Sequence, residues 1–304
     1  MKARAFKYFR AESLQDALQA FDRAGGEGCY LAGGQSLVPS LSLRLQAPEL
    51  LIDISRIEAL TGISRSGNVL RVGALTRHAE MLTSPEIARH APLLRRAAPF
   101  VAHPAIRNMG TFGGTIALAD PSAEFPAVTL AMDAEFEIAS LAGTRTTKAD
   151  GFFRGLFETG LEPGEILTAI NIPCFGEADR CVFDELARRR GDYALVGAGV
   201  QATFAQDQVS QGLVSQGLVS MVRIAFLSIG PTPVRARHAE AAITGRMLSA
   251  DAISDAQVAL GDDLDPEDNE ETSAAMRMHL ARVLLGRLLG RLSQPDCMRE
   301  DKVT

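Results

Sequence analysis

The alternation of apolar and polar residues over the first sixty positions predicts a strand–helix–strand–helix–strand unit. Residues 12–21 place apolar side chains at helical spacing, Ser13 stands at the expected N-cap, and Gly25-Gly26 can end the helix. Short apolar runs at 29–32 and 50–54 are typical of strands. We therefore expect a small β-α-β unit at the N-terminus.

Between residues 60 and 175 the pattern changes to strands separated by helices. Ser84-Pro85 predicts a helix start, because serine caps a helix N-terminus and proline fits its first turn. A further helix is predicted from about Pro121 to Leu130. Strand-like segments lie at 69–74, 136–139 and 166–172, the last stopped by Pro173.

Residues 174–179 mark the expected domain boundary, and the pattern beyond them predicts three strands followed by three helices. The strands fall at 180–188, 196–204 and 221–229, and the helices at about 233–244, 249–260 and 273–293. The last helix carries an apolar stripe that we interpret as core or partner contact, formed by Met276, Leu280, Val283, Leu284 and Leu288. A five-residue repeat, 209–213 and 214–218, reads as an expanded hairpin loop.

Composition narrows the function classes. The chain has 304 residues and a net charge of -6, with no basic run, which argues against nucleic-acid binding. No signal peptide and no apolar run long enough to span a bilayer is present, so the cytoplasm is the expected compartment. The 4 cysteines and 5 histidines lack metal-ligand spacing, so we expect no iron–sulfur cluster or zinc site in this chain.

Two glycine-rich stretches carry the candidate chemistry: residues 31–37, the first glycine segment, and residues 106–115, the second glycine segment, which closes on Ala119-Asp120-Pro121. Both set paired glycines beside hydroxyl and amide side chains, which suits a backbone that approaches a phosphate and offers it N–H donors. A glycine turn without a ligand would have a similar composition. Two such segments in one chain favour a ligand with two phosphates, such as a dinucleotide.

Other motifs argue against other activities. Residues 197–202 match the dinucleotide-binding pattern G-x-G-x-x-A. They continue into a strand-like segment, however, and the acidic residue expected about twenty positions further on is missing. We therefore do not interpret them as a nucleotide site. No Gly-x-Ser-x-Gly elbow or visible nucleophile–base pair is present, which argues against hydrolysis.

Five separated segments, at 32–37, 51–54, 106–114, 119–127 and 189–195, resemble the FAD-binding medium subunits of molybdenum hydroxylases. That family includes carbon monoxide dehydrogenase medium chains, xanthine dehydrogenase FAD domains and subunits of bacterial N-heterocycle hydroxylases. The resemblance implies an α+β, vanillyl-alcohol-oxidase-type FAD-binding fold of two subdomains, with a C-terminal domain of a three-stranded antiparallel sheet and three helices. The implied boundaries are 1–176 for the FAD-binding domain, with subdomains of about 1–57 and 58–176, and 177–304 for the C-terminal domain.

The resemblance also implies a set of FAD-binding residues. Residues 32–36 would wrap the pyrophosphate, Asp120 would hold the ribose, and Tyr193 would lie near the flavin ring. The other phosphate side would be held by Thr111, Gly113, Gly114 and Thr115. The full set is Ala32, Gly33, Gly34, Gln35, Ser36, Leu37, Ile106, Gly110, Thr111, Gly113, Gly114, Thr115, Asp120 and Tyr193. The chain departs from the family where Gln often precedes Ile-Arg-Asn, at His103-Pro104-Ala105, and at Met109 and Leu118, where Arg and His are frequent.

The resemblance finally implies a redox complex. A large subunit would carry molybdopterin, a small subunit two [2Fe-2S] clusters, and this chain FAD, which passes electrons to NAD, a quinone, a redox protein or oxygen. Three alternatives stay open: a free-standing flavin reductase or oxidase, the flavin subunit of an aromatic-CoA reductase, and a scaffold protein without cofactor. The aromatic-CoA reductase subunits carry an extra cluster-binding cysteine loop, and we see no such cysteine cluster here.

Overall fold

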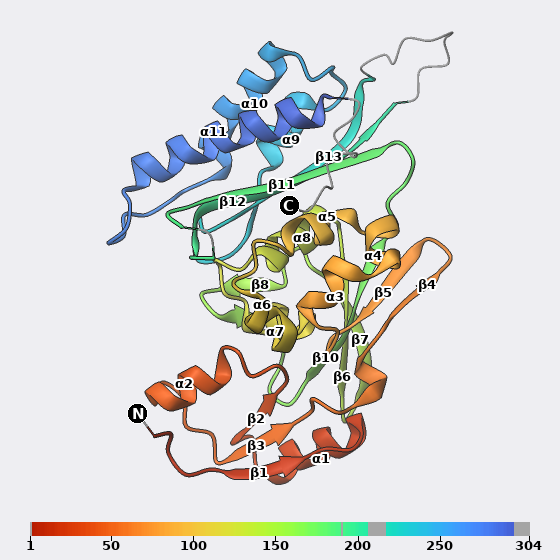
Figure 1. The fold of residues 1–304 in the computed structure, drawn as a ribbon, viewed down its shortest axis with the longest axis vertical. Helices are drawn as coiled ribbons and strands as arrows, with labels where there is room; N and C mark the ends of the chain where they lie inside the picture. Colours follow the sequence, from red (N-terminus) through yellow and green to blue (C-terminus); the bar gives the residue numbers. More distant parts are fainter. Residues whose placement is uncertain (1, 190, 206–216, 295–304) are drawn as a thin grey trace.

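In the computed structural model, which describes residues 2–189, 191–205 and 217–294, the chain forms three tiers (Figure 1). The lowest tier is a three-stranded parallel sheet in the order β1-β3-β2. Its elements are β1 (Lys7–Arg10), α1 (Leu14–Arg23), β2 (Gly28–Leu31), α2 (Leu37–Leu43) and β3 (Leu50–Asp53). The predicted β-α-β unit is confirmed, and the Ser13 hydroxyl caps α1 by accepting from the Asp16 N–H at 3.1 Å.

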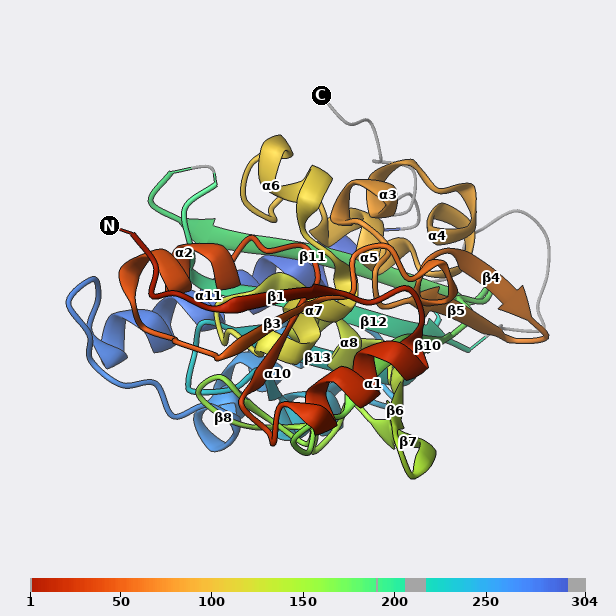
Figure 2. The ribbon, with the colours of Figure 1, turned by 90° about the horizontal axis from the view of Figure 1, so that it is seen from below.

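The middle tier is a five-stranded antiparallel sheet in the order β4-β5-β10-β6-β7, with helices over one face (Figures 1 and 2). Its strands are β4 (Ile63–Ser66), β5 (Val69–Gly73), β6 (Glu135–Ser140), β7 (Gly143–Lys148) and β10 (Ile166–Pro173). Its helices are α3 (His78–Thr83), α4 (Pro85–His90), α5 (Pro92–Ala97), α6 (Pro104–Met109), α7 (Phe112–Leu118) and α8 (Glu124–Ala131). A 3-10 turn, η1 (Glu58–Leu60), precedes the sheet, and a small hairpin, β8 (Phe153–Gly155) with β9 (Glu158–Thr159), precedes β10.

One prediction about this tier is confirmed and one is corrected. Ser84 caps α4, with Pro85 in its first turn. Helix α8 begins at Glu124 rather than Pro121, because the Asp120 side chain holds the preceding turn by accepting from the Ser122 N–H at 2.9 Å. The second glycine segment is largely helical: it covers 106–109 of α6 and 112–115 of α7, joined at Gly110 and Thr111.

The upper tier is an antiparallel sheet in the order β11-β12-β13-β14, covered by three helices. Its elements are β11 (Asp179–Ala187), β12 (Ala194–Phe204), β13 (Val219–Leu227), β14 (Val234–Arg235), α9 (Arg237–Ile243), α10 (Ala250–Asp263) and α11 (Ala274–Leu292). The predicted three strands are present, and the short β14 adds a fourth that corrects the three-stranded sheet. Most of the repeat at 209–218 lies outside the described residues.

The two faces of this sheet pack against different tiers, as a side-chain period of two requires. Cys181 and Phe183 belong to the core of the middle tier, whereas Val182 between them belongs to the core beneath the C-terminal helices. The glycines of the G-x-G pattern lie inside strand β12, where Gly199 faces Leu93 of α5. That pattern is therefore a packing feature of a strand, as the sequence indicated.

Helix α11 buries Leu284 and Leu288 of the predicted stripe, and Leu280 packs against the same core, but the buried face only partly coincides with the stripe. Met276 is exposed, whereas the buried positions run along Ala281, Leu284, Leu285, Leu288, Leu289 and Leu292. Among the described residues, no helix has the length and apolar character needed to cross a bilayer.

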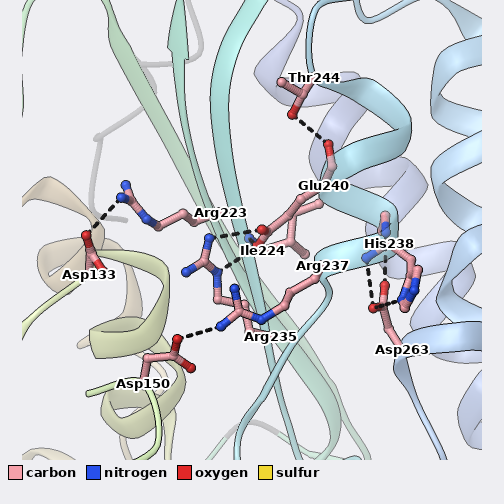
Figure 3. A network of polar contacts seen from close by, with 11 residues as sticks. Asp133, Asp150, Arg223, Ile224, Arg235, Arg237, His238, Glu240, Thr244 and Asp263 are labelled. Atoms are coloured by element: carbon pink, nitrogen blue, oxygen red, sulfur yellow. Dashed lines mark hydrogen bonds and ion pairs between the residues drawn. The ribbon is translucent and has the colours of Figure 1, made fainter. Parts of the chain in front are cut away.

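Charged pairs also join the upper and middle tiers (Figure 3). Arg223 on β13 reaches Asp133 after α8 at 2.9 Å, and Arg237 at the start of α9 pairs with Asp150. Within the upper tier, Glu240 accepts from Arg235 and from the Ile224 N–H. These contacts and the shared core fix the upper tier on the helices of the middle tier.

Candidate functional site

The first glycine segment links β2 to α2 at the edge of the parallel sheet. Gly34 has a φ of +72°, a conformation that a residue with a side chain adopts only at a cost. The Gln35 side-chain amide donates to the Gly33 carbonyl oxygen at 3.0 Å, so it braces the turn. Ser36 stands at the N-cap of α2, but its hydroxyl makes no capping hydrogen bond. The Ser36 hydroxyl is therefore open to a ligand.

The second glycine segment has its backbone donors bonded within the protein. The Gly110 N–H donates to the Ile106 carbonyl, and the Gly113 N–H donates to the Ala74 carbonyl, each at 2.7 Å. The Phe112 and Thr115 amides likewise bind backbone carbonyls. The Thr111 hydroxyl caps α7 by accepting from the Gly114 N–H at 3.2 Å. The expectation that these glycines open N–H donors to a phosphate is thus corrected, because their amides bond to the Ile106 and Ala74 carbonyls and to the Thr111 hydroxyl.

The two segments lie directly against each other. A Cβ placed on Gly33 would be 2.3 Å from the Met109 carbonyl oxygen and 2.9 Å from the Gly110 Cα. A Cβ on Gly113 would lie 2.4 Å from the Ala74 side chain, so this glycine lets α7 approach β5. The second glycine segment therefore forms the rear support of the first.

The first glycine segment, in contrast, keeps its amides open. In the described parts of the chain, no hydrogen bond leaves the backbone N–H groups of residues 33–37. Consecutive unpartnered N–H groups in a turn with a left-handed residue form a concave donor set that suits an anion. This arrangement can hold a phosphate or a pyrophosphate.

A cavity of about 500 Å³ opens beside this donor set. Its lining comes from β2, the first glycine segment, α2, the end of β3, the start of α3 and α6. The lining residues are Leu31, Ala32, Gly33, Gly34, Gln35, Val38, Pro39, Asp53, Ser55, Arg77, Ile106 and Met109. Five predicted site residues are among them. Of the other predicted residues, Ser36 and Leu37 continue the first segment, and Gly110, Thr111, Gly113, Gly114 and Thr115 form the support behind it.

Asp53 is a cavity residue that the sequence did not single out as a site. Its carboxylate accepts from the Tyr8 hydroxyl and, at 2.9 Å, from the Ser55 N–H. Burial alone would raise the pKa of Asp53, but these hydrogen bonds and the charge of Arg10 outweigh it, so the pKa lies below its ordinary value. The cavity wall therefore carries a fixed carboxylate that can accept from a ligand hydroxyl or amine.

Arg77 supplies positive charge at the same cavity. Its guanidinium donates to the Met109 carbonyl, and its backbone pairs with Thr111. The Arg77 N–H also donates to the Glu80 carboxylate at 2.8 Å. Sequence reasoning missed Asp53, Ser55 and Arg77 because they reach the cavity from distant parts of the chain. The predicted strand at 50–54, which contains Asp53, was the available signal.

Asp120 and Tyr193 lie close together at a different place, where the turn after α7 meets the connection between β11 and β12. Tyr193 is 69% exposed. Partial desolvation and then the nearby Asp120 carboxylate raise the pKa of the Tyr193 phenol. These two residues are brought together as a pair, outside the lining of the cavity at the first glycine segment.

A second cavity, of about 370 Å³, lies between the middle and upper tiers near this pair. It is lined by Pro99, Phe100, Glu185, Ala187, Arg188, Arg189 and Gly191. Burial raises the pKa of Glu185 to about 8, and the Glu124 and Asp184 carboxylates add to the shift. Burial also raises the pKa of Glu124 to about 7. The seam between the tiers thus holds two carboxyl groups that favour their protonated forms.

The donor set at the first glycine segment fits the diphosphate of FAD. It combines open amides, the Ser36 hydroxyl and the Arg77 guanidinium beside a cavity, and a fixed carboxylate faces that cavity from β3. Within the described residues, no cluster of three or more His, Cys, Asp or Glu side chains is arranged to hold a metal ion.

Comparison with known proteins gives matches along nearly the whole chain. Residues 4–175 match the family model described as FAD binding domain in molybdopterin dehydrogenase, and residues 181–292 match the CO dehydrogenase flavoprotein C-terminal domain. The 6-hydroxypseudooxynicotine dehydrogenase complex subunit alpha of Paenarthrobacter nicotinovorans is 38% identical over 291 residues, covering 96% of this chain and 95% of that protein.

Further relatives agree with these matches. The carbon monoxide dehydrogenase medium chain of Hydrogenophaga pseudoflava is 34% identical over 279 residues, covering 90% of this chain and 94% of that one. The solved structure of quinoline 2-oxidoreductase from Pseudomonas putida 86 contains a chain that superposes with a TM-score of 0.88 at 35% identity, covering 97% of this chain and 99% of that chain.

Proposed function

This chain belongs to the FAD-binding medium subunits of molybdenum hydroxylases, an oxidoreductase family, and we propose that it is the electron-transfer subunit of such a complex. In this proposal a small partner subunit delivers electrons from two [2Fe-2S] clusters, and a large partner subunit carries molybdopterin and the substrate. The electrons leave toward an external acceptor: NAD, a quinone, a redox protein or oxygen. We place the complex in the cytoplasm.

The open amides of residues 33–37 beside the 500 Å³ cavity are the observation that carries the proposal. These amides and the Ser36 hydroxyl would hold the FAD pyrophosphate, and Arg77 would offset its charge. The second glycine segment would hold this cradle in place through the contact between Gly33 and Met109. Bound FAD supplies a group that takes up and releases electrons, while the protein positions it and sets its electrostatic surroundings.

We assign Asp120 to a ribose hydroxyl and Tyr193 to the neighbourhood of the flavin ring. Their proximity to each other supports an assignment to one region of the ligand. Ile106, which lines the cavity, is assigned to the phosphate side, and the remaining residues of the second glycine segment are assigned to the support behind the cradle. We also divide the chain into an FAD-binding domain, 1–176, with subdomains of about 1–57 and 58–176, and a C-terminal domain, 177–304. The family matches at 4–175 and 181–292 support this division.

The test is purification from the native host through a tag on this chain, followed by a visible spectrum and by flavin, iron and molybdenum analysis. We expect stoichiometric FAD on this chain and iron and molybdenum on two co-purified partners. A lone chain with FAD that oxidises or reduces a small organic compound would instead establish a free-standing flavoenzyme. Several iron atoms bound by the isolated chain would favour the aromatic-CoA reductase type. A chain that binds no added FAD would overturn the flavin role itself.

A further inference from the structure

His78 is a buried histidine directly behind the second glycine segment, and no part of the proposed function uses it. It is the first residue of α3 and is 5% exposed. Its Nε2 lies 2.9 Å from the Thr111 carbonyl oxygen, and its backbone N–H donates to the Gly110 carbonyl oxygen at 3.1 Å. One residue therefore binds both members of the turn that joins α6 to α7.

The imidazole is neutral, with its proton on Nε2. A carbonyl oxygen can only accept, so the nitrogen facing Thr111 must carry the hydrogen. Burial, with a smaller contribution from the charges of Arg107 and Arg77, lowers the pKa of His78 to about 4, against the opposing effect of the hydrogen bond to Thr111. The Phe125 ring packs edge-on against the imidazole at a centroid distance of 5.1 Å.

The second ring nitrogen of His78, Nδ1, lowers the stability of the fold. Nδ1 is buried without a hydrogen-bond partner, and a Cβ on Gly110 would lie 3.0 Å from it. A buried acceptor without a partner destabilises a fold. The Thr111 carbonyl does not need the imidazole to be satisfied, because it also accepts from the Thr115 N–H at 3.1 Å within α7. An apolar side chain of similar size would thus fill this position at a smaller cost in folding free energy.

The contacts of His78 lead directly to the proposed cradle. His78 holds Gly110 and Thr111, the adjacent Arg77 holds the Met109 carbonyl, and that carbonyl lies against Gly33. Interfaces packed this closely transmit small displacements, because neighbouring atoms have no free space to absorb them. A shift of the 109–111 turn would therefore move the open amides of the first glycine segment.

We propose that His78 is a positioning residue for FAD: its Nε2–H fixes the 109–111 turn, and through Met109 and Gly33 sets the geometry of the amides that hold the pyrophosphate. The inference rests on the proposed FAD site. It assigns to His78 a role in cofactor affinity that differs from a role in folding, because the ring places an unsatisfied nitrogen in the interior, which folding alone does not require.

Two substitutions separate these roles. Met in place of His78 fills a similar volume without a donor, whereas Gln carries an N–H at about the position of the imidazole Nε2. We expect His78→Met to bind FAD about five- to ten-fold more weakly than the unchanged chain, as the loss of one positioning hydrogen bond suggests. We expect the melting temperature of the FAD-free His78→Met chain to stay unchanged or rise, and His78→Gln to restore FAD affinity.

The experiment titrates FAD into flavin-free full-length chain, and records the melting temperature of each variant without FAD and the visible spectrum of the bound flavin. His90→Met is the matched control, because His90 is also buried but pairs with Glu86 on α4 and contacts neither glycine segment. Equal FAD affinity of His78→Met and the unchanged chain would overturn the inference. So would a parallel fall of affinity and melting temperature in both His78 variants. An unchanged chain that binds no FAD would overturn the proposed function, and this inference with it.

Discussion

The Met109 carbonyl oxygen occupies the space in which a side chain on residue 33 would begin, since a Cβ on Gly33 would lie 2.3 Å from that oxygen. The two glycine segments, about eighty residues apart in sequence, are therefore halves of one structure. The first offers open amides to the cavity, and the second holds its backbone in place. A glycine can thus be required in a cofactor site because of the protein behind it as well as the ligand in front of it.

Substitution of Gly33 by Ala is expected to disrupt the cradle. The methyl group must displace the Met109 backbone, and such overpacking typically costs about 1–3 kcal/mol of unfolding free energy. We expect a lower melting temperature and a loss of most FAD binding, measured by denaturation and flavin titration. Gly230→Ala is the control, because a Cβ there meets no atom within 4 Å and its φ is not positive. Unchanged FAD affinity in Gly33→Ala would contradict the close contact.

Ser36 and Thr111 are expected to respond differently to the same substitution. The Ser36 hydroxyl makes no capping bond, so Ser36→Ala should weaken FAD binding and leave the melting temperature of the flavin-free chain unchanged. The Thr111 hydroxyl caps α7, so Thr111→Ala should lower the unfolding free energy by about 1 kcal/mol. Thr111→Ser keeps the cap and should restore stability. A destabilised Ser36→Ala chain would show that this hydroxyl supports the fold.

Glu185 is expected to make the fold less stable as the pH rises. Burial, with help from Glu124 and Asp184, raises its pKa from the ordinary 4.5 to about 8 in the folded chain. The unfolded chain therefore releases this proton at lower pH than the folded chain, and stability falls progressively between about pH 4.5 and pH 8. Glu185→Gln should remove that part of the dependence and raise the melting temperature at pH 8.

The check is the melting temperature of both chains from pH 5 to pH 9. Glu124→Gln provides a second comparison, since removal of a neighbouring carboxylate should bring the pKa of Glu185 down and weaken the same pH dependence. Parallel profiles for Glu185→Gln and the unchanged chain would rule out a protonated Glu185.

The pair of Arg223 and Asp133 should couple the upper and middle tiers more strongly than the pair of Arg237 and Asp150. The first pair has side chains 18% and 29% exposed, whereas the second is 57% and 46% exposed and screened by water. Double-mutant cycles should give a coupling of about 1 kcal/mol for Arg223 with Asp133 and less than about 0.5 kcal/mol for the exposed pair.

The variants for these cycles are Arg223→Met with Asp133→Asn, and Arg237→Met with Asp150→Asn. Asparagine suits residue 133 because it tolerates the φ of +56° that Asp133 adopts. Equal coupling energies in the two cycles would show that burial of the side chains does not set the strength of these ion pairs.

The sequence by itself determined the elements whose signals are local. Ser13 and Ser84 mark helix starts through hydroxyls that accept from the backbone N–H three residues ahead. The period of two in 196–204 identifies a strand despite its G-x-G pattern. The two glycine segments and the Asp120 turn also stood out, because glycines and short polar residues are chosen for local backbone geometry. From these motifs the family and its FAD-binding α+β fold followed.

Only the tertiary structure decided which side chains meet. Asp53 and Arg77 reach the first cavity from β3 and from the start of α3, and no spacing along the chain records that convergence. The buried face of α11 differs from the predicted stripe because the sheet beneath it, not the helix period alone, selects the face that packs. Distant partners also decide that the amides are open in the first glycine segment and bonded in the second. The carbonyls of Ala74 and Thr76, which accept from the second segment, lie on another part of the chain. Composition alone cannot distinguish an N–H donor used by the fold from one left for a ligand.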